Sequence, residues 1–243
     1  MKEVLLQIQS NRALTESVYE MRLTGDVSAI TASGQFVNIK LDGLFLRRPI
    51  SVCDVENGVL TLLYKVVGKG TEQMANMQAG ETLNVLVGLG NGYDLSLSGE
   101  APVLMGGGVG VPPMYMLAKE LIKQGKKVTA ILGFNTQAEV FYEEEFKRLG
   151  ATVIVTTADG SYGQKGFVTD ALKGVDYTYF YTCGPEPMLK AVFKATNTSG
   201  QFSFEERMGC GFGACMGCSC KTVTGYKRIC KEGPVLVKEE ILW

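Results

Sequence analysis

Five of the seven cysteines in this chain lie within residues 205–230, EERMGCGFGACMGCSCKTVTGYKRIC. Four of them form the pattern Cys-x4-Cys-x2-Cys-x11-Cys, which comprises Cys210, Cys215, Cys218 and Cys230. This is the plant-type spacing for the thiolate ligands of a 2Fe–2S cluster. The interspersed glycines let the backbone wrap closely and direct N–H groups at the sulfurs. The pattern predicts an iron–sulfur centre, with Cys220 as a small buried thiol outside the ligand set.

Two other uses of these cysteines compete with the cluster. A disulfide framework is disfavoured because the cysteine count is odd and no secretory signal precedes the pattern. A structural zinc site is the stronger alternative, although zinc ribbons usually show two Cys-x2-Cys knuckles and this chain has one. A zinc-stabilised interaction protein without enzymatic activity therefore remains an alternative hypothesis, from a different functional class.

The composition of the chain limits the number of domains, the class of partner and the location that we expect. The chain has 243 residues, of which 46% are hydrophobic and 20% charged, with a net charge of −1. This profile is that of a globular protein with one large or two modest domains, and it suggests neither nucleic acid nor an anionic membrane as a partner. No apolar run approaches the roughly 18 residues of a membrane span. We expect a cytoplasmic protein, in keeping with free thiols and a cluster.

The chain contains no histidine. This absence excludes Rieske clusters, histidine-ligated zinc, Ser-His-Asp and Cys-His catalysis, and acid–base chemistry by imidazole. Bound cofactors must then supply most of the chemistry.

Residues 1–98 are predicted to form a small antiparallel β-barrel. Short runs rich in Val, Ile, Leu and Tyr recur at even spacing, separated by turn residues. The predicted strands are 2–9, 18–23, 36–41, 50–56, 59–66 and 82–89, with short helical turns at 28–30 and 72–77. Asn57-Gly58 between two of these runs is a strong hairpin signal.

Two patches of this barrel could bind a phosphate-bearing ligand. The first is the basic strand entry Arg48-Pro49-Ile50-Ser51. The second is Gly70-Thr71 at a predicted helix start, where backbone N–H groups and the helix dipole attract anions. Each patch alone is a common turn or helix entry, but their occurrence together favours one ligand.

Residues 99–204 alternate between strands and helices, which predicts a parallel sheet with helices on both faces. The predicted strands are 101–105, 128–133, 152–157, 177–182 and 201–204, and the predicted helices are 112–124, 141–149, 168–173 and 186–195. Ligands of such sheets bind beyond the carboxyl ends of the strands. Residues 205–243 are left as a separate cluster-binding segment.

Two turns of the α/β region fall at such strand ends. The first contains Gly106, Gly107, Gly108 and Gly110 and can cradle a pyrophosphate, although Pro113 stands where a dinucleotide fingerprint has its third glycine. The second is Cys183-Gly184-Pro185, in which the cysteine could equally be a structural thiol. No basic cluster follows the second strand of this region, which favours NAD over NADP.

This order of motifs resembles the ferredoxin–NADP reductase family, whose members bind FAD on the barrel and a nicotinamide nucleotide on the α/β domain. Residues 48–51, 206–211 and 230–235 are further similar to the electron-transfer subunits of class 1B dihydroorotate dehydrogenases. The resemblance covers essentially the whole chain, because three cofactor motifs occur in the expected order.

The resemblance implies the cofactor contacts and the partner. Cys183 is implied to lie near nicotinamide and flavin, as a candidate catalytic residue. The expected FAD contacts are Arg48, Pro49, Ile50, Ser51, Leu63, Tyr64, Lys65, Gly70 and Thr71. Lys65 stands where the family usually has arginine, so the charge is kept and the bidentate fork is lost.

The implied partner is an FMN-containing catalytic subunit that oxidises dihydroorotate in pyrimidine biosynthesis, in a heterotetramer with two copies of each subunit. Electrons would pass through the cluster and FAD to NAD+. Within the same class, the flavin subunit of an NADH-dependent ferredoxin–NADP oxidoreductase or of a hydrogenase-linked diaphorase is the alternative.

Overall fold

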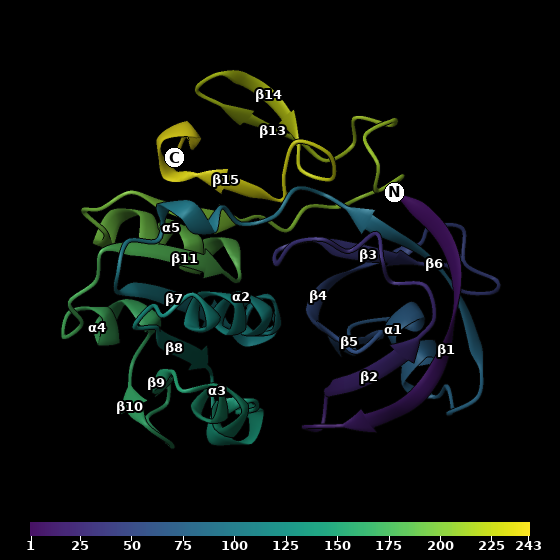
Figure 1. Ribbon diagram of the computed structural model, residues 1–243, viewed down its shortest axis with the longest axis horizontal. Helices are drawn as coiled ribbons and strands as arrows, with labels where there is room; N and C mark the ends of the chain where they lie inside the picture. Colours follow the sequence, from purple (N-terminus) through teal and green to yellow (C-terminus); the bar gives the residue numbers. More distant parts are fainter.

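A closed antiparallel barrel occupies the first part of the chain in the computed structural model, which describes residues 1–243 (Figure 1). Its strand order is β1-β2-β5-β4-β3-β6. The strands are β1 (Lys2–Ala13), β2 (Val18–Thr24), β3 (Phe36–Ile39), β4 (Arg48–Glu56), β5 (Val59–Lys65) and β6 (Thr82–Leu89). All six predicted strands are present, and the predicted barrel is confirmed.

The barrel closes because alternate side chains of its strands point inward. In β1, Val4, Leu6 and Ile8 are buried while the residues between them are exposed. Asn57 and Gly58 both have positive φ, at 50° and 75°, and connect β4 to β5 as the predicted hairpin turn. The predicted helix at 72–77 begins earlier, as α1 (Lys69–Ala75). Residues 28–30 form a turn and no helix.

The second layered unit is a seven-stranded sheet in the order β10-β9-β8-β7-β11-β12-β15. Its strands are β7 (Pro102–Gly107), β8 (Thr129–Phe134), β9 (Thr152–Thr157), β10 (Gln164–Lys165), β11 (Tyr179–Cys183), β12 (Gly200–Ser203) and β15 (Val235–Val237). All pairs are parallel except β12 with β15. The sequence prediction ended this series at residue 204 and therefore lacked β15, and it also lacked the two-residue strand β10.

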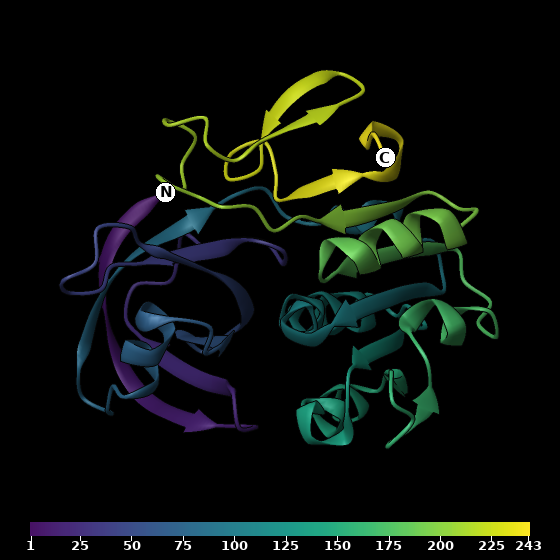
Figure 2. The same ribbon diagram turned by 180° about the vertical axis from the view of Figure 1, so that it is seen from behind.

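Helices cover both faces of the sheet, as predicted (Figures 1 and 2). The helices are α2 (Pro112–Lys123), α3 (Glu143–Leu149), α4 (Val168–Leu172) and α5 (Glu186–Ala195). Helices α2 and α3 share a core with barrel residues, whereas α4 and α5 pack in the core on the other side. Helix α3 starts two residues later than predicted because Tyr142 has φ of +66°, a left-handed conformation that cannot continue a helix.

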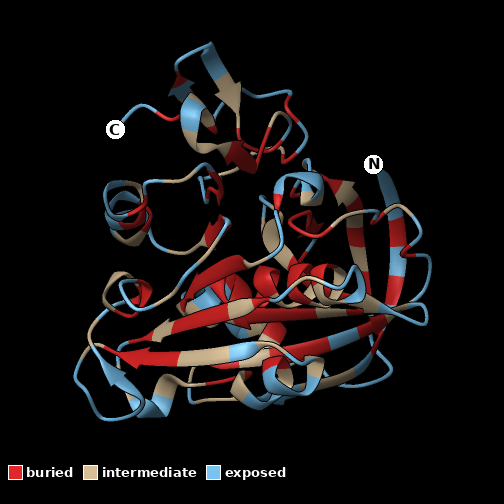
Figure 3. Ribbon diagram, turned by 60° about the vertical axis from the view of Figure 1, so that its left-hand side comes forward, coloured by how far each residue is buried: buried red, intermediate tan, exposed pale blue.

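The C-terminal segment lies across the top of the two larger units (Figures 1 and 2). It contains the hairpin β13 (Ser219–Thr222) and β14 (Gly225–Arg228), which sequence reasoning missed. After this hairpin the chain returns to the sheet as β15, where Val235 pairs with Ser203. The hairpin is mainly exposed or half-buried, in contrast to the buried strands of the barrel and sheet (Figure 3). No helix in the protein has the length and apolar character needed to cross a membrane.

A buried carboxylate joins the barrel to helix α3. Glu20 of β2 is only 7% exposed. Its Oε2 accepts a hydrogen bond of 2.7 Å from the Tyr142 hydroxyl, and its Oε1 accepts one of 2.8 Å from Arg12 Nε. Burial raises the pKa of Tyr142 well above its ordinary value, so its hydroxyl stays a donor at neutral pH. A second link is the ion pair of 2.9 Å between Lys119 on α2 and Asp54 on β4.

We expect Tyr142→Phe to lower the free energy of unfolding by about 1.5–3 kcal/mol, because it removes a donor from a buried carboxylate. Urea unfolding followed by circular dichroism measures this change. Tyr162→Phe is the matched control, since the exposed Tyr162 hydroxyl also donates to a glutamate, Glu143, at 2.9 Å. That control should change stability by no more than about 0.5 kcal/mol. Equal effects of the two variants would contradict a special role for the buried contact.

Candidate functional site

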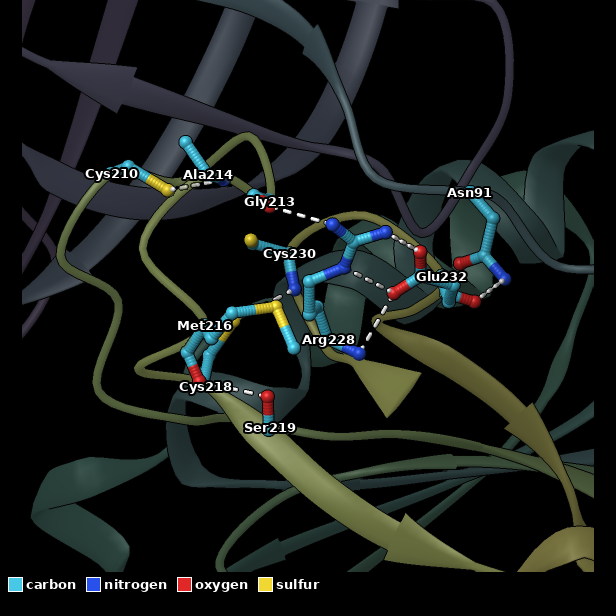
Figure 4. Close-up of polar contacts among 10 residues, drawn as sticks. All are labelled: Asn91, Cys210, Gly213, Ala214, Met216, Cys218, Ser219, Arg228, Cys230 and Glu232. Carbon is cyan, nitrogen blue, oxygen red and sulfur yellow. Dashed lines mark hydrogen bonds and ion pairs between the residues drawn. The ribbon is translucent and has the colours of Figure 1, made fainter. Parts of the chain in front are cut away.

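The four patterned cysteines lie on loops between β12 and β15. Cys218 and Cys230 are buried, Cys210 is half-buried and Cys215 is exposed. Backbone N–H groups already point at two of the sulfurs (Figure 4). Cys210 Sγ accepts hydrogen bonds from Ala214 N at 3.2 Å and Cys215 N at 3.5 Å, and Cys218 Sγ accepts one from Cys230 N at 3.4 Å. Such N–H donors stabilise the negative charge of thiolate ligands.

The two ends of the cysteine pattern differ in their readiness to ionise. Burial by itself would raise the pKa of Cys210, but backbone N–H groups of Cys215, Phe212 and Ala214 outweigh it and lower the pKa to about 6. Burial and the neighbouring Cys218 thiol raise the pKa of Cys230 to about 12. The backbone N–H groups thus favour the thiolate at Cys210, whereas burial favours the thiol at Cys230. Metal binding at both positions requires the thiolate.

The four cysteines fit the ligand number of either kind of metal centre, and their plant-type spacing is that of a 2Fe–2S cluster. A structural zinc site needs four ligands around one ion, whereas a 2Fe–2S cluster spreads four cysteines over two irons. Cys220 lies in β13 and is half-buried, where it was predicted to be buried, and burial raises its pKa. Its position outside the ligand set stays a prediction.

The two basic and glycine-rich patches of the barrel are in contact. A Cβ added to Gly70 would lie 2.3 Å from Arg48 Nε, so a larger residue at position 70 would displace this guanidinium from its present position. The N–H groups of the first turn of α1, which include those of Gly70 and Thr71, have no intrahelical acceptors. The Thr71 hydroxyl is occupied within the turn, where it accepts from Val67 N at 2.9 Å. The site thus offers a cation beside backbone donors.

The other predicted flavin residues differ in accessibility. Residues 48–51 are all half-buried at the start of β4, where a ligand can reach them. Leu63 and Tyr64 are buried, at 3% and 2% exposure, and the Tyr64 hydroxyl donates to Asn11 Oδ1 at 2.9 Å. Lys65 is half-buried at the end of β5. The side chains of Leu63 and Tyr64 pack in the core, so only the backbone groups of these two residues can contact a ligand.

The two predicted nucleotide turns meet at the carboxyl edge of the sheet. Strands β7 and β11 are parallel neighbours, with Gly106 paired to Cys183. A Cβ on Gly110 would lie 2.2 Å from the carbonyl oxygen of Cys183, so the close approach of the turns requires glycine there. Gly108 has φ of +52° and faces open space. The glycine turn runs through a 3-10 turn into α2, which begins with Pro112 and Pro113.

Cys183 stands between these turns as a neutral thiol. Burial raises its pKa to about 12, although a hydrogen bond with Ser203 opposes the shift. Its neighbours include Tyr93, whose hydroxyl donates to the carbonyl of Thr182 at 3.4 Å. A thiol in this state can contact a ring or donate weakly, but it is not a nucleophile near pH 7.

Three residues of the site were missed by sequence reasoning. Asn38 of β3 is 1% exposed, and its Nδ2 donates to the carbonyl of Cys210 at 3.3 Å. Asn91, between the barrel and the sheet, exchanges side-chain bonds of 2.8 Å and 3.0 Å with Val235. Arg228 donates to the carbonyl of Gly213 at 2.7 Å. Only Asn38 had a signal, as a polar residue inside an apolar strand.

This architecture defines an oxidoreductase of the ferredoxin–NADP reductase type that carries an additional iron–sulfur-binding domain. The model of the oxidoreductase NAD-binding domain matches residues 104–194, and the model of the iron–sulfur cluster binding domain of dihydroorotate dehydrogenase B matches residues 205–242.

Curated relatives identify the family. Electron transfer subunits of dihydroorotate dehydrogenase B (NAD+) from Fusobacterium nucleatum and Bacillus pumilus are 45% and 44% identical, over 96% and 99% of this chain and 96% and 98% of theirs. The chain belongs to this family of electron transfer subunits, and its predicted function as such a subunit is confirmed.

Solved structures agree with the fold. The structure of an NADH-dependent reduced ferredoxin–NADP oxidoreductase aligns with a TM-score of 0.89 at 30% identity and covers 99% of this chain and 90% of its own. A ferredoxin NADP+ reductase from Neisseria gonorrhoeae with bound FAD and NADP aligns at 0.70 with 20% identity, over 80% and 90% of the two chains. The first belongs to the alternative class considered above, but its identity is lower than that of the curated relatives.

We expect serine substitution of Cys210, Cys215, Cys218 or Cys230 to abolish the cluster, because each removes a thiolate ligand. Cys220→Ser is the matched control, since it alters a thiol of the same segment without removing a ligand. Iron and acid-labile sulfide, two of each per chain in the unchanged protein, are the measurement. Stoichiometric zinc without sulfide would contradict this assignment.

Proposed function

We propose that the chain carries electrons from an FMN-containing catalytic subunit to NAD+, in a heterotetramer with two copies of each subunit. Its barrel, residues 1–98, holds FAD; residues 99–204 hold NAD; and residues 205–243 hold the cluster. When bound, these groups supply the redox chemistry, with single electrons crossing the cluster and hydride exchanged between flavin and nicotinamide. Free thiols and a cluster support a reducing compartment, the cytoplasm, as the location of the complex.

One contact carries this proposal. The Asn38 amide donates to the carbonyl of cluster residue Cys210 at 3.3 Å, and Asn38 is the register partner of Pro49 of the flavin patch on the neighbouring strand β4. A single side chain therefore connects the cluster loop to the strand entry that would hold FAD. This adjacency supports transfer between the two groups within one chain.

The residues of the chain bind and orient the cofactors. Arg48 places a fixed cation beside Gly70 for the FAD pyrophosphate, with Ser51 supplying a hydroxyl at the same strand. The glycine turn at 106–110 approaches the nucleotide with its backbone, and Gly184 and Pro185 line the neighbouring turn. Cys183 contributes a neutral thiol near the nicotinamide. The chain contains no histidine, so no imidazole is available to deprotonate the carbon of a substrate ring.

The partner would meet the cluster at the exposed side of its loops. Cys215 is exposed, and beside it Phe212 and Met216 expose 43% and 55% of their surface. Apolar side chains beside a redox centre offer a partner a surface from which water can be displaced. We place the catalytic subunit there.

We expect Arg48→Ala to weaken FAD binding about ten- to a hundredfold, because it removes a charge-assisted phosphate contact worth about 1.5–3 kcal/mol. Titration of the apoprotein with FAD measures the affinity. Arg47→Ala is the control, since Arg47 is engaged with Asn84 at 2.7 Å and Glu3 at 2.8 Å on the outside of the barrel. An unchanged affinity in Arg48→Ala would contradict the assignment of this patch to the pyrophosphate.

We expect the isolated chain to oxidise NADH with an artificial acceptor and to be inert toward dihydroorotate. With its partner it should support NAD+-dependent orotate formation. Cys215→Ser should lose this coupled reaction and keep NADH oxidation, because the cluster lies between the partner and FAD. Steady-state assays of both reactions, on protein shown to be folded and FAD-loaded, provide the measurement. Equal loss of both activities would place the cluster outside the electron path.

A further inference from the structure

An ion pair bridges the turn that contains Cys230, the last cysteine of the cluster pattern. Arg228 and Glu232 flank Cys230, and Arg228 Nε donates to Glu232 Oε2 at 2.9 Å while Nη2 donates to Oε1. The backbone N–H of Arg228 donates to the same Oε2 at 2.8 Å, and Glu232 N donates back to the Arg228 carbonyl at 2.8 Å. The pair is thus bidentate and held by backbone bonds on both sides. Cys230 lies within this turn (Figure 4).

The same guanidinium reaches the other end of the cysteine pattern. Arg228 Nη1 donates to the carbonyl of Gly213 at 2.7 Å, and Gly213 lies in the loop between Cys210 and Cys215. One side chain therefore contacts both segments that carry the cluster ligands (Figure 4).

The turn is also anchored to the body of the protein. Asn91 Nδ2 donates to the carbonyl of Glu232 at 3.2 Å, and Asn91 N donates to the carbonyl of Gly233. Asn91 follows β6, where the chain leaves the barrel for the sheet. The position of the ion pair is therefore fixed relative to both larger units.

The charges of the pair act on an anionic centre. Four thiolates and two sulfides leave a 2Fe–2S centre with net negative charge, which becomes more negative on reduction. A nearby fixed cation favours the reduced form and a nearby fixed anion disfavours it. Arg228 and Glu232 balance each other, and their side chains are 25% and 34% exposed, so water only partly screens them.

We propose that Arg228 is a positioning residue for the cluster, which holds the loop at 210–215 against the turn at Cys230, and that Arg228 and Glu232 adjust the reduction potential of the cluster in opposite directions. This inference rests on the proposed function, because it requires the cluster. It assigns Arg228 and Glu232 opposite electrostatic effects on the reduction potential of the cluster. A purely structural pair would give both substitutions the same effect.

The test uses the full-length chain reconstituted with iron and sulfide, and a redox titration followed by electron paramagnetic resonance. Arg228→Gln leaves Glu232 unpaired and should shift the one-electron reduction equilibrium about threefold to tenfold toward the oxidised cluster, where tenfold corresponds to about 59 mV. Glu232→Gln leaves Arg228 unpaired and should shift it by a similar factor toward the reduced cluster. The double variant should restore the potential but release iron faster than the unchanged protein.

Lys227→Gln and Glu240→Gln provide matched controls. This ion pair of 2.7 Å lies in the same C-terminal segment with similar exposure, 25% and 26%, and has no contact with the loop at 210–215. Each control should shift the equilibrium by less than about twofold. Arg228→Lys keeps the positive charge but cannot make the bidentate pair with the carboxylate. The reduction potential of this variant should stay near that of the unchanged chain, while its cluster should release iron faster.

Shifts of the same sign in Arg228→Gln and Glu232→Gln, or shifts no larger than those of the controls, would overturn the inference. If Arg228→Gln retains no cluster, Glu232→Gln decides the sign against Glu240→Gln, and an unchanged or lowered potential there overturns it. Failure of the unchanged chain to assemble any cluster would instead overturn the proposed function, and this inference with it.

Discussion

The pairing of β15 with β12 is the constraint on which the cluster segment depends. The chain leaves the sheet after Ser203 and returns at Val235, and these two residues are direct partners in the antiparallel ladder. All four cysteine ligands therefore lie on one excursion whose two ends are closed by backbone hydrogen bonds. Closing a long loop in this way fixes its ends, and the contacts of Asn91 with Val235 reinforce the closure from the barrel side. The cluster loops are held to the sheet and the barrel together.

The division between rigid positioning and cofactor chemistry follows from the residues available. Without histidine the chain has no side chain whose ordinary pKa lies near pH 7. Its buried thiols and phenols are shifted toward the neutral form, as the pKa values of Cys53, Cys183 and Tyr142 show, with burial as the main cause. Such groups pack, donate hydrogen bonds and exclude water. The fold thus supplies geometry, and electron transfer needs little more from side chains.

Sequence patterns predicted the fold where the signal was local and repeated. The six barrel strands, the Asn57-Gly58 hairpin and the α/β alternation all rest on periodicity or turn chemistry within a few residues. Strand β15 escaped prediction because it has only three residues and takes its partner from far earlier in the chain. The conformation of Tyr142 escaped prediction because a left-handed tyrosine is uncommon and its hydroxyl bonds to Glu20, a residue far away in the sequence.

The candidate site was predictable to the same extent and for the same reason. The spacing of the four cysteines is enough to predict a cluster site. The register of β7 with β11 shows that Gly106 and Cys183 are neighbours in the sheet. The burial of Tyr64 and the contact of Arg48 with Gly70 depend on how barrel strands face each other, which no single stretch encodes. Asn38 shows the limit most clearly, because its partner Cys210 lies in a different segment far along the chain.

The environment of the cluster combines an exposed edge with a protected interior, and this combination determines how its potential can be controlled. A redox centre that exchanges electrons with a partner needs one accessible side, which Cys215 provides, and water there weakens every charge–charge interaction. Backbone N–H groups bonded directly to sulfur, such as those of Ala214 and Cys230, are short-range and escape this screening. These N–H groups therefore determine most of the protein's effect on the reduction potential of the cluster. A half-exposed ion pair such as Arg228 with Glu232 can then adjust it by a modest factor without disturbing the edge that the partner requires.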